Sequence, residues 1–359
     1  MLIIDAHLDL AWNALQWNRN LAESVYTIRT RESSVAGKGR ALGTVALPDM
    51  RQGRIAVSIV TLLARSTGQP APNIDYGSTA QAYAVAHGQL AYYRALEQQG
   101  LVRVLTESAA LNQHVAEWQQ WEAAGAVSAD APPLGFVISM EGADPIHDPA
   151  QLESWHQAGL RLIGITHYGY GRYAGGTATE HGLTDIGREL LKEMRRLRIP
   201  LDVTHCSDQA FWQALEVYDG SILTSHQNCR ALVPHQRQFS DAQLKAVIER
   251  DGVIGAAFDT WMLQTGWKID HTTNERVSLA TVVDHIDHVC QLAGNANHAA
   301  LGTDLDGGFG REQSPRDLDT IADLQQIAVI LAQRGYVDGD IKAIMHGNWL
   351  RFLTRALGG

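Results

Sequence analysis

Seven short apolar runs along the chain each end at a histidine or a carboxylate. The first covers residues 2–4 and leads into Asp5-Ala6-His7-Leu8-Asp9. The other six end at residues of the same types, namely Glu141, His167, His205, His226, Asp259 and Asp304. In a parallel barrel the strands carry branched apolar side chains, and the residues at their C-terminal ends point into a bowl formed by the following loops. The pattern therefore predicts a (β/α)8 TIM barrel with a metal site at the C-terminal ends of its strands.

Strand-like and helix-like segments alternate over most of the chain. Strands are expected over residues 2–4, 55–63, 101–105, 134–140, 160–166, 200–204, 221–225, 252–258 and 299–303. Helices are expected over residues 78–99, 149–158, 185–198, 208–217, 241–250, 279–293, 315–334 and 338–357. A polar, arginine-rich stretch at 27–40 is interpreted as a long first loop, and residues 259–279 as an insertion. Alternating β and α segments without runs of hairpins indicate an α/β fold with a parallel sheet.

Length and composition favour one globular domain over residues 1–359. A bare barrel takes roughly 250 residues, and decorated barrels exceed ~400, so 359 residues suit one barrel with loop insertions. Hydrophobic residues make up 45% of the chain and charged residues 19%, which is enough apolar material for a large core.

The charge balance argues against nucleic acid as a partner. The chain has 39 acidic and 29 basic residues and a formal net charge of -10, and it has no Lys/Arg-rich stripe that could neutralise phosphates. We therefore expect no nucleic acid among the partners of this protein.

Cysteine usage and segment hydropathy indicate a cytoplasmic protein. Three cysteines, Cys206, Cys229 and Cys290, are too few for a disulfide framework and leave at least one free thiol. No segment reaches the roughly 18 apolar residues that a membrane span needs, and the N-terminus lacks the features of a signal peptide.

The residues at the strand ends have the chemistry of a two-metal site. His7 and Asp9 are two apart at the end of a strand, so their side chains share one side of the backbone. A carboxylate at Glu141 can offer one oxygen to each of two cations about 3.5–4 Å apart. His205 and His226 end consecutive strands, where both imidazoles can bind one ion. Each residue alone has an ordinary explanation as a loop, cap or core residue, but their shared position favours ligation.

Together these motifs resemble the membrane dipeptidase (renal dipeptidase) family of metallopeptidases, within the amidohydrolase-type barrels. The resemblance runs nearly end to end and keeps the family's order. Its motifs are Asp5-Ala6-His7-Leu8-Asp9, Glu141-Gly142, Gly164-Ile165-Thr166-His167, Leu183-Thr184, Asp202-Val203-Thr204-His205, Ser225-His226, Gly302-Thr303-Asp304-Leu305-Asp306-Gly307 and Gly347-Asn348-Trp349-Leu350-Arg351.

The resemblance implies a site with two Zn²⁺ ions. It implies the following ligands: His7 and Asp9 for one ion, His205 and His226 for the other, and Glu141 as the bridge between them. It further implies that His167 contacts the substrate, that Arg237 pairs with the substrate carboxylate, and that Asp304 is the catalytic aspartate. A homodimer is also implied.

A hydrolytic mechanism follows from these roles. Two zinc ions lower the pKa of a bridging water towards neutrality, which makes hydroxide available for attack on the carbonyl of a dipeptide. One zinc ion and His167 are expected to stabilise the oxyanion, and Asp304 to carry the proton from the water to the leaving amine. A bidentate Arg237 would restrict cleavage to very short peptides, with a C-terminal D-residue left open.

Two positions depart from the family pattern. Gln238 replaces the usual Asn after the arginine, and Leu305 replaces the usual Phe between the two aspartates. Both are expected to affect packing and substrate preference rather than ligation. Asp306 and Asp259 are interpreted as loop residues. The aromatic pair Trp261 and Trp267 is compatible both with a pocket lining and with a packed loop.

Two alternatives remain open. One is a related amidohydrolase that acts on another small amide or an N-acyl amino acid; many such barrels begin with HxH and bridge their metals through a modified lysine, in contrast to His7-Leu8-Asp9 and Glu141 here. The other is a metal-binding scaffold protein without catalysis, which predicts loss of the reacting residues. Because barrels host many reactions, the fold alone does not decide.

Overall fold

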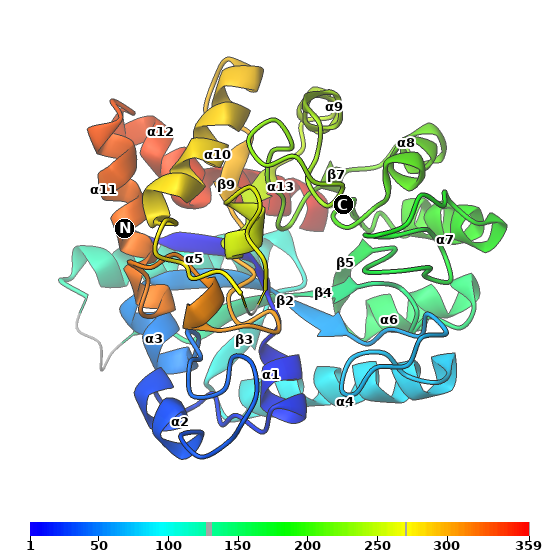
Figure 1. Ribbon diagram of the computed structural model, residues 1–359, viewed down its shortest axis with the longest axis horizontal. Helices are drawn as coiled ribbons and strands as arrows, with labels where there is room; N and C mark the ends of the chain where they lie inside the picture. Colours follow the sequence, from blue (N-terminus) through cyan, green and yellow to red (C-terminus); the bar gives the residue numbers. More distant parts are fainter. Residues whose placement is uncertain (127–130, 270, 359) are drawn as a thin grey trace.

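The computed structural model describes residues 1–126, 131–269 and 271–358, and it has the predicted parallel barrel with helices around it (Figure 1). The predicted domain over 1–359 and the predicted insertion over 259–279 each include positions outside these ranges. The strands are β1 (Ile3–Leu8), β2 (Ile55–Leu63), β3 (Val102–Val104), β4 (Leu134–Glu141), β5 (Leu160–Gly164), β6 (Leu201–Asp202), β7 (Ile222–Leu223), β8 (Ile254–Ala256) and β9 (Ala299–Leu301). Their order is β7-β6-β5-β4-β2-β1-β9-β8, with every pairing parallel.

Strand β3 lies outside this ring, although its segment at 101–105 was predicted as one of the barrel strands. β4 pairs with β2 along one edge. On its other edge β4 pairs first with β3, at Leu134 to Phe136, and then with β5, from Ile138 to Glu141. The eight remaining strands form the barrel.

The barrel closes between β7 and β8. Thr224 pairs with Ile254 in an isolated parallel bridge, and the Gly255 N–H donates to the Thr224 carbonyl at 2.9 Å. The strands approach so closely here that a Cβ on Gly255 or Gly302 would lie 2.0 or 1.6 Å from the Ser225 carbonyl oxygen. Only glycine fits at these two positions, which lie beside the strand end that carries His226.

Helices connect the strands and cover the outside of the barrel. They are α1 (Leu10–Gln16), α2 (Val25–Arg31), α3 (Leu47–Gln52), α4 (Thr79–Gln98), α5 (Ser108–Ala123), α6 (Leu152–Gln157), α7 (Asp185–Arg196), α8 (Asp208–Val217), α9 (Asp241–Glu249), α10 (Leu279–Ala293), α11 (Gln325–Gln333), α12 (Asp338–Lys342) and α13 (Asn348–Leu357). Short 3-10 turns lie at Pro149–Gln151, Thr260–Met262, Arg311–Gln313 and Ile321–Leu324, and a π-helical segment joins α12 to α13 at Ala343–Gly347.

The interpretation of residues 27–40 as a loop is wrong in its first part, because α2 begins at Val25. The Ser24 side chain caps this helix by accepting from the Thr27 N–H, and Val25 and Ile28 are buried. The arginines of this segment gave it the polar character of a loop in the sequence. In the structure they form ion pairs; Arg29, for example, pairs with Asp319 at 2.9 Å. A short apolar face and a cap were therefore sufficient for a helix.

Other boundaries also differ from the prediction. Helix α5 fills a stretch to which no helix was assigned, and 315–320 is not helical although a helix was expected from 315. Strands β6 and β7 have two residues each, shorter than predicted, because the backbone beyond them bonds to a side chain: the Asp202 carboxylate accepts from the N–H groups of Thr204 and Ser225.

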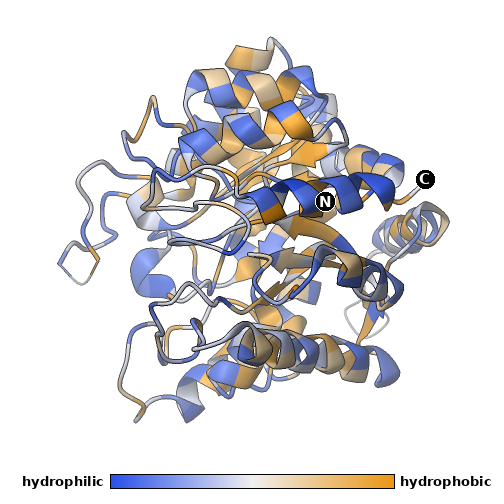
Figure 2. Ribbon diagram, turned by 90° about the vertical axis from the view of Figure 1, so that its right-hand side faces the viewer, coloured by the Kyte–Doolittle hydropathy of each residue, from blue (hydrophilic) through white to orange (hydrophobic). Residues whose placement is uncertain are grey.

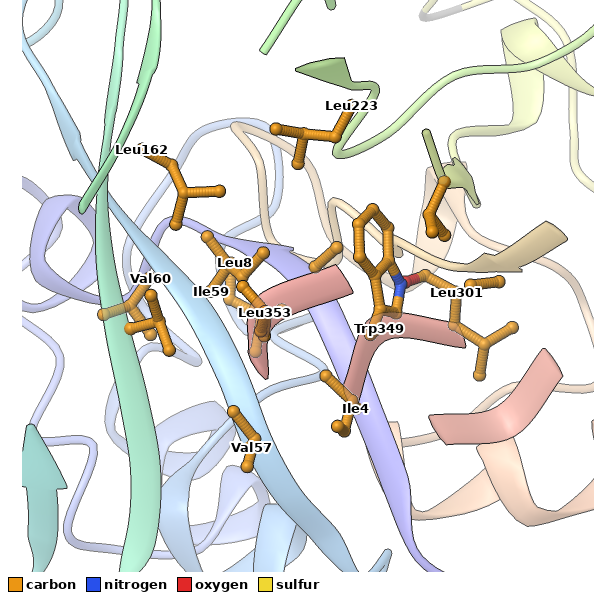
Figure 3. Packing of buried hydrophobic residues seen from close by; sticks show 14 of the residues in the cluster. Ile4, Leu8, Val57, Ile59, Val60, Leu162, Leu223, Leu301, Trp349 and Leu353 are labelled. Carbon is orange, nitrogen blue, oxygen red and sulfur yellow. The ribbon is translucent and has the colours of Figure 1, made fainter. Parts of the chain in front are cut away.

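The core is formed by the strands and the inward faces of the helices. Hydrophobic residues concentrate on the strands and on the helix surfaces turned towards them, with hydrophilic residues on the outside (Figure 2). Figure 3 shows side chains of β1, β2, β5, β7 and β9 packed together with Trp349 and Leu353 of α13. The buried Trp349 indole donates to the Leu301 carbonyl at 2.8 Å and ties the last helix to β9.

None of the helices formed by the described residues combines the length and the apolar character that crossing a membrane requires.

Candidate metal centre

The C-terminal ends of six barrel strands bring all the predicted site residues except Arg237 to one place. His7 is in β1 and Asp9 follows it, Glu141 is the last residue of β4, and the remaining four lie three residues beyond the ends of β5, β6, β7 and β9: His167, His205, His226 and Asp304. In a parallel barrel all of these ends open on the same rim. Convergence of distant segments is therefore a direct consequence of the fold.

Glu141 lies at the centre of the cluster, and its two oxygens face different histidines. Oε2 is 3.5 Å from His7 Nε2. Oε1 is 3.3 Å from His205 Nε2, 3.4 Å from His226 Nε2 and 3.8 Å from His167 Nε2. One oxygen of the carboxylate therefore faces His7, and the other faces the remaining three histidines.

His205 and His226 form one of these groups. Their Nε2 atoms face each other at 3.0 Å, and burial lowers the pKa of both imidazoles well below the usual value. Each Nδ1 is engaged elsewhere, His205 with the Thr177 hydroxyl at 2.8 Å and His226 with the Ser225 hydroxyl at 3.0 Å. If these Nδ1 atoms carry the protons, two Nε2 lone pairs point at one spot, which is the arrangement of a metal-binding pair.

The second group contains His7, Asp9 and Asp304. The His7 Nε2 atom is 3.7 Å from an Asp9 oxygen and 3.8 Å from an Asp304 oxygen. Burial opposes a charge on His7, but Glu141 and Asp9 outweigh it and raise the pKa of His7 well above its usual value. Among the described residues His7 Nε2 and Asp9 Oδ1 are buried without a hydrogen-bond partner.

These residues fit a bound cation. Buried polar atoms in proteins are nearly always hydrogen-bonded, so orphaned atoms at His7 and Asp9 call for another partner. Histidine nitrogens and carboxylate oxygens are the donor set that Zn²⁺ accepts. Three ligand groups have all their donor atoms within 4.8 Å of one another: His7, Glu141 and His226; Glu141, His167 and His205; His7, Asp9 and Asp304.

Two carboxylates that sequence reasoning missed hold the strand ends in place. Asp5 accepts from the Thr303 N–H at 2.8 Å and from the Thr303 hydroxyl at 2.6 Å, which ties β1 to the turn that carries Asp304. Asp202 accepts from Thr204 and Ser225 and so ties the two turns that precede His205 and His226. The sequence did contain a signal for both residues: each is a carboxylate inside an apolar run, two or three residues before a histidine.

The backbone is strained at two of the site residues. His205 has φ of 65° and Asp304 has φ of 58°, both in the left-handed region that non-glycine residues rarely adopt. Such conformations persist only where surrounding contacts enforce them, and they cluster at functional sites. Asp5 and Asp202 supply contacts of this kind on either side.

His167 lies beside the cluster and is neutral. Burial lowers its pKa well below the usual value, with further lowering by Arg65 and Arg237. Its Nδ1 is 3.4 Å from Nη1 of Arg65. Because a guanidinium has only donors, Nδ1 accepts and the ring proton belongs on Nε2, which faces Glu141.

Arg237 is buried on the other side of His205. Its Nη1 donates to Gln227 at 2.7 Å, and Nη2 donates to the His226 carbonyl at 3.0 Å and lies 3.3 Å from His205 Nε2. Burial lowers the pKa of Arg237, although its ordinary value is so high that the side chain stays charged. The arginine therefore lies beside both histidines of its group.

A cavity opens in front of the cluster, and loop residues form much of its wall. It is lined by Asp9, Glu141, His167, His205, Arg237 and Asp304, together with Trp12, Arg65, Tyr168, Asp259 and Trp261. Asp259, interpreted above as loop structure, does cap the turn at Thr260–Met262, but it also belongs to this wall. Burial raises its pKa to about 6, and the Gln313 amide donates to both of its oxygens.

The two tryptophans of the predicted aromatic pair have different roles. Trp261 lines the cavity, whereas Trp267 is a packed loop residue whose indole donates to the Thr273 carbonyl at 3.2 Å.

The two departures from the family pattern are both buried packing positions: Gln238 donates to the Met262 carbonyl, and Leu305 belongs to the core. Asp306 anchors the first loop by accepting from Arg19, Thr44 and Val45.

A parallel barrel that gathers histidines and carboxylates around a cavity at the C-terminal ends of its strands is the architecture of the metal-dependent hydrolase barrels. Comparison with known proteins defines the family. The chain belongs to the membrane dipeptidase family (peptidase family M19), whose family model matches residues 1–357. The resemblance seen in the motifs is thereby confirmed.

Curated relatives and solved structures are consistent with this family. An uncharacterised Klebsiella pneumoniae protein from the pqqA 5' region is 31% identical over 61% of the chain and 81% of its own length. The dipeptidase tcpJ of Claviceps purpurea is 29% identical over 61% of the chain, and the match spans about half (51%) of that protein.

Among solved structures, the dipeptidase AC aligns with a TM-score of 0.78 and 24% identity over 100% of this chain and 99% of its own. A Rhodobacter sphaeroides metallopeptidase, solved with a phosphinate mimic of L-Ala-D-Ala, aligns with a TM-score of 0.76 and 23% identity over 99% of both chains. At these identities the alignments establish the barrel fold.

Proposed function

We propose that this protein is a metallo-dipeptidase that holds two Zn²⁺ ions and hydrolyses dipeptides, including dipeptides with a C-terminal D-residue. Membership of the dipeptidase family supports the reaction class. The observation that carries the two-ion site is the position of Glu141, with one oxygen facing His7 and the other facing His205 and His226. A fold neighbour that binds a mimic of L-Ala-D-Ala supports the D-residue.

The ligands of the two ions follow from this division. His7, Asp9 and Glu141 would hold one ion, and Glu141, His205 and His226 the other. When bound, such a pair of ions lowers the pKa of a water molecule towards 7 and polarises a carbonyl group. The protein residues around the ions then bind the substrate and move the protons.

His167 is proposed to stabilise the oxygen of the scissile carbonyl as negative charge develops on it. The contact between its Nδ1 and Arg65 supports a proton on Nε2, on the side of Glu141. A donor held in advance at that place strengthens its hydrogen bond as the oxygen becomes an anion, which lowers the barrier.

Asp304 is proposed to accept a proton from the attacking water and to return it to the leaving amine. Its carboxylate is 3.8 Å from His7 Nε2 and lines the cavity. Desolvation raises the pKa of Asp304 well above its usual value, which suits a carboxyl group that must carry a proton within the catalytic cycle.

Arg237 is proposed to pair with the C-terminal carboxylate of the substrate. A guanidinium binds a carboxylate through two parallel hydrogen bonds. Because Arg237 lies next to His205 and His226, the carboxylate would have to follow directly after the scissile bond, which restricts the substrate to dipeptides.

An assay of the purified protein tests the proposal. The panel contains L,L and L,D dipeptides, a tripeptide and N-acetyl amino acids, each measured before and after chelation while metal content is determined. Dipeptide hydrolysis that disappears with the metal and returns with two equivalents of Zn²⁺ is expected. Faster cleavage of N-acetyl amino acids would favour the related amidohydrolase, and metal binding without hydrolysis would favour the scaffold. Activity that survives complete removal of metal would refute the mechanism.

Three statements about this chain stay predictions from the sequence: that it forms a single domain, that it is cytoplasmic and that it forms a homodimer.

A further inference from the structure

The cavity wall contains a second arginine, Arg65. The proposed reaction does not need it to bind the substrate carboxylate. Among the described residues, the permanently cationic side chains in the cavity wall are Arg65 and Arg237. A dipeptide of neutral residues has one carboxylate, and Arg237 accounts for it. Arg65 therefore needs a separate explanation.

Arg65 is held rigidly at the mouth of the barrel. It lies two residues beyond β2, and its backbone bonds to the segment opposite it: its N–H donates to the Ile74 carbonyl and its carbonyl accepts from the Tyr76 N–H, both at 2.8 Å. The guanidinium stands over the ring of Tyr168 at 5.9 Å. The charge is thereby positioned before any ligand arrives.

Most of the donors of Arg65 are not used by the protein. Nη1 contacts His167 at 3.4 Å, and Nε forms an ion pair with Asp75 at 3.4 Å that lacks hydrogen-bond geometry. The Asp75 carboxylate is already satisfied by the N–H and hydroxyl of Thr67, at 3.0 and 2.7 Å. No hydrogen bond from Nη2 to a described residue is found. A half-buried guanidinium with open donors in a cavity is suited to binding a carboxylate.

The polarity of the cavity decides which part of a substrate meets Arg65. Arg65 contacts His167, the His167 ring lies 4.3 Å from the His205 ring, and His205 contacts Arg237, so the two arginines flank one continuous face. The carboxylates of Asp304 and Asp259 also line the cavity and lie close enough to repel each other. An N-terminal ammonium group favours the acidic part, which leaves the C-terminal residue between the arginines.

We propose that Arg65 forms a second carboxylate site and that the enzyme prefers dipeptides whose C-terminal residue is aspartate or glutamate. The α-carboxylate of that residue pairs with Arg237 and its side-chain carboxylate pairs with Arg65. This inference rests on the proposed dipeptidase function and names its substrate class.

Isosteric substrate pairs test the proposal. We expect kcat/KM for Ala-Asp to exceed that for Ala-Asn by about tenfold or more, and Ala-Glu to exceed Ala-Gln similarly, for the C-terminal enantiomer that is cleaved. In Arg65→Gln both members of a pair slow down through the lost contact to His167, but their ratio falls to about one. Arg65→Lys keeps part of the preference. Arg196→Gln, a surface control on α7 that loses ion pairs with Glu153 and Glu193, keeps the wild-type ratio.

A binding measurement separates this inference from the proposed reaction. Calorimetric titration with L- and D-aspartate and with L- and D-asparagine requires no turnover. Tighter aspartate binding in the wild type, lost in Arg65→Gln, supports the second site even if no dipeptide is hydrolysed, in which case only the dipeptidase function fails.

Other outcomes overturn the second site. Hydrolysis of dipeptides at equal rates for acid and amide, or equal binding of aspartate and asparagine, refutes it while leaving the dipeptidase function intact. A preference for acidic residues that persists unchanged in Arg65→Gln shows that Arg65 only orients His167.

Discussion

Residues at the strand ends and residues in the loops of the cavity wall form two different regions of the same site. The strand-end ligands are held by the barrel itself and braced by Asp5 and Asp202. The wall residues Arg65, Asp259 and Trp261 come from the segments after β2 and β8. A rigid scaffold under variable loops lets one barrel keep its chemistry while its specificity changes. The two regions should therefore respond differently to substitution.

Replacement of the bridging carboxylate is expected to have the largest effect. Glu141→Gln removes the negative charge from the carboxylate that lies between His7 and the pair His205 and His226. Zinc content should fall below two per chain, and kcat/KM should fall by more than the ~100-fold that loss of an outer partner of a ligand costs. Metal analysis, kinetics and circular dichroism check this; a folded variant with two ions and wild-type activity would contradict the bridge.

Arg237→Lys is expected to affect substrate binding. A lysine keeps the charge but loses the planar pair of donors, so the KM should rise by about 10- to 100-fold with a smaller change in kcat. Steady-state kinetics on the best dipeptide measures the split. A fall in kcat at unchanged KM would mean that Arg237 acts on the reaction rather than on the carboxylate.

Asp202→Asn tests the bracing of the strand ends. The amide can no longer accept as strongly from Thr204 and Ser225, so His205 and His226 lose their preset positions. We expect metal affinity or activity to fall by about 10- to 100-fold. Competition with a zinc chelator measures the affinity. Asp338→Asn, an exposed position on α12, provides a charge-matched control, and equal affinity in the two variants would argue against bracing.

Asp259 in the loop wall is expected to affect stability rather than chemistry. Burial raises its pKa from 3.8 to about 6, so its stabilising contribution is present below pH 3.8 and is lost as the pH rises through 6. At 1.36 kcal/mol per unit, the loss amounts to about 3 kcal/mol. Asp259→Asn should therefore be more stable than the wild type above pH 6, and the difference should shrink at pH 4. Urea unfolding at several pH values measures it, and a difference independent of pH would contradict the assignment.

The strand-end region was largely predictable, because its signal is local. An apolar run specifies a buried strand, and the residue after it specifies the chemistry, so His7, Glu141 and Asp304 were recognisable before the fold was known. The residues of the loop wall were not predictable in this way. Asp259 and Arg65 each follow an apolar run as well, but nothing in the sequence states that their side chains line the cavity.

Secondary structure shows the same division. Long apolar runs such as β2 and β4 were found close to their predicted bounds. β3 was also predicted as a strand, yet it pairs outside the ring because β5 occupies the same edge of β4 further along. Helix α2 was missed because its arginines form tertiary ion pairs that a local pattern does not reveal.

By itself, the amino-acid sequence determined the parallel barrel, the family and the types of residue at each strand end, since these follow from short-range alternation of apolar and polar positions. Tertiary structure alone decided which oxygen of Glu141 faces which histidine, how Asp5 and Asp202 brace the turns, and that Arg65 lines the cavity. These features depend on contacts between segments far apart in the chain, whose distances only the closed barrel sets.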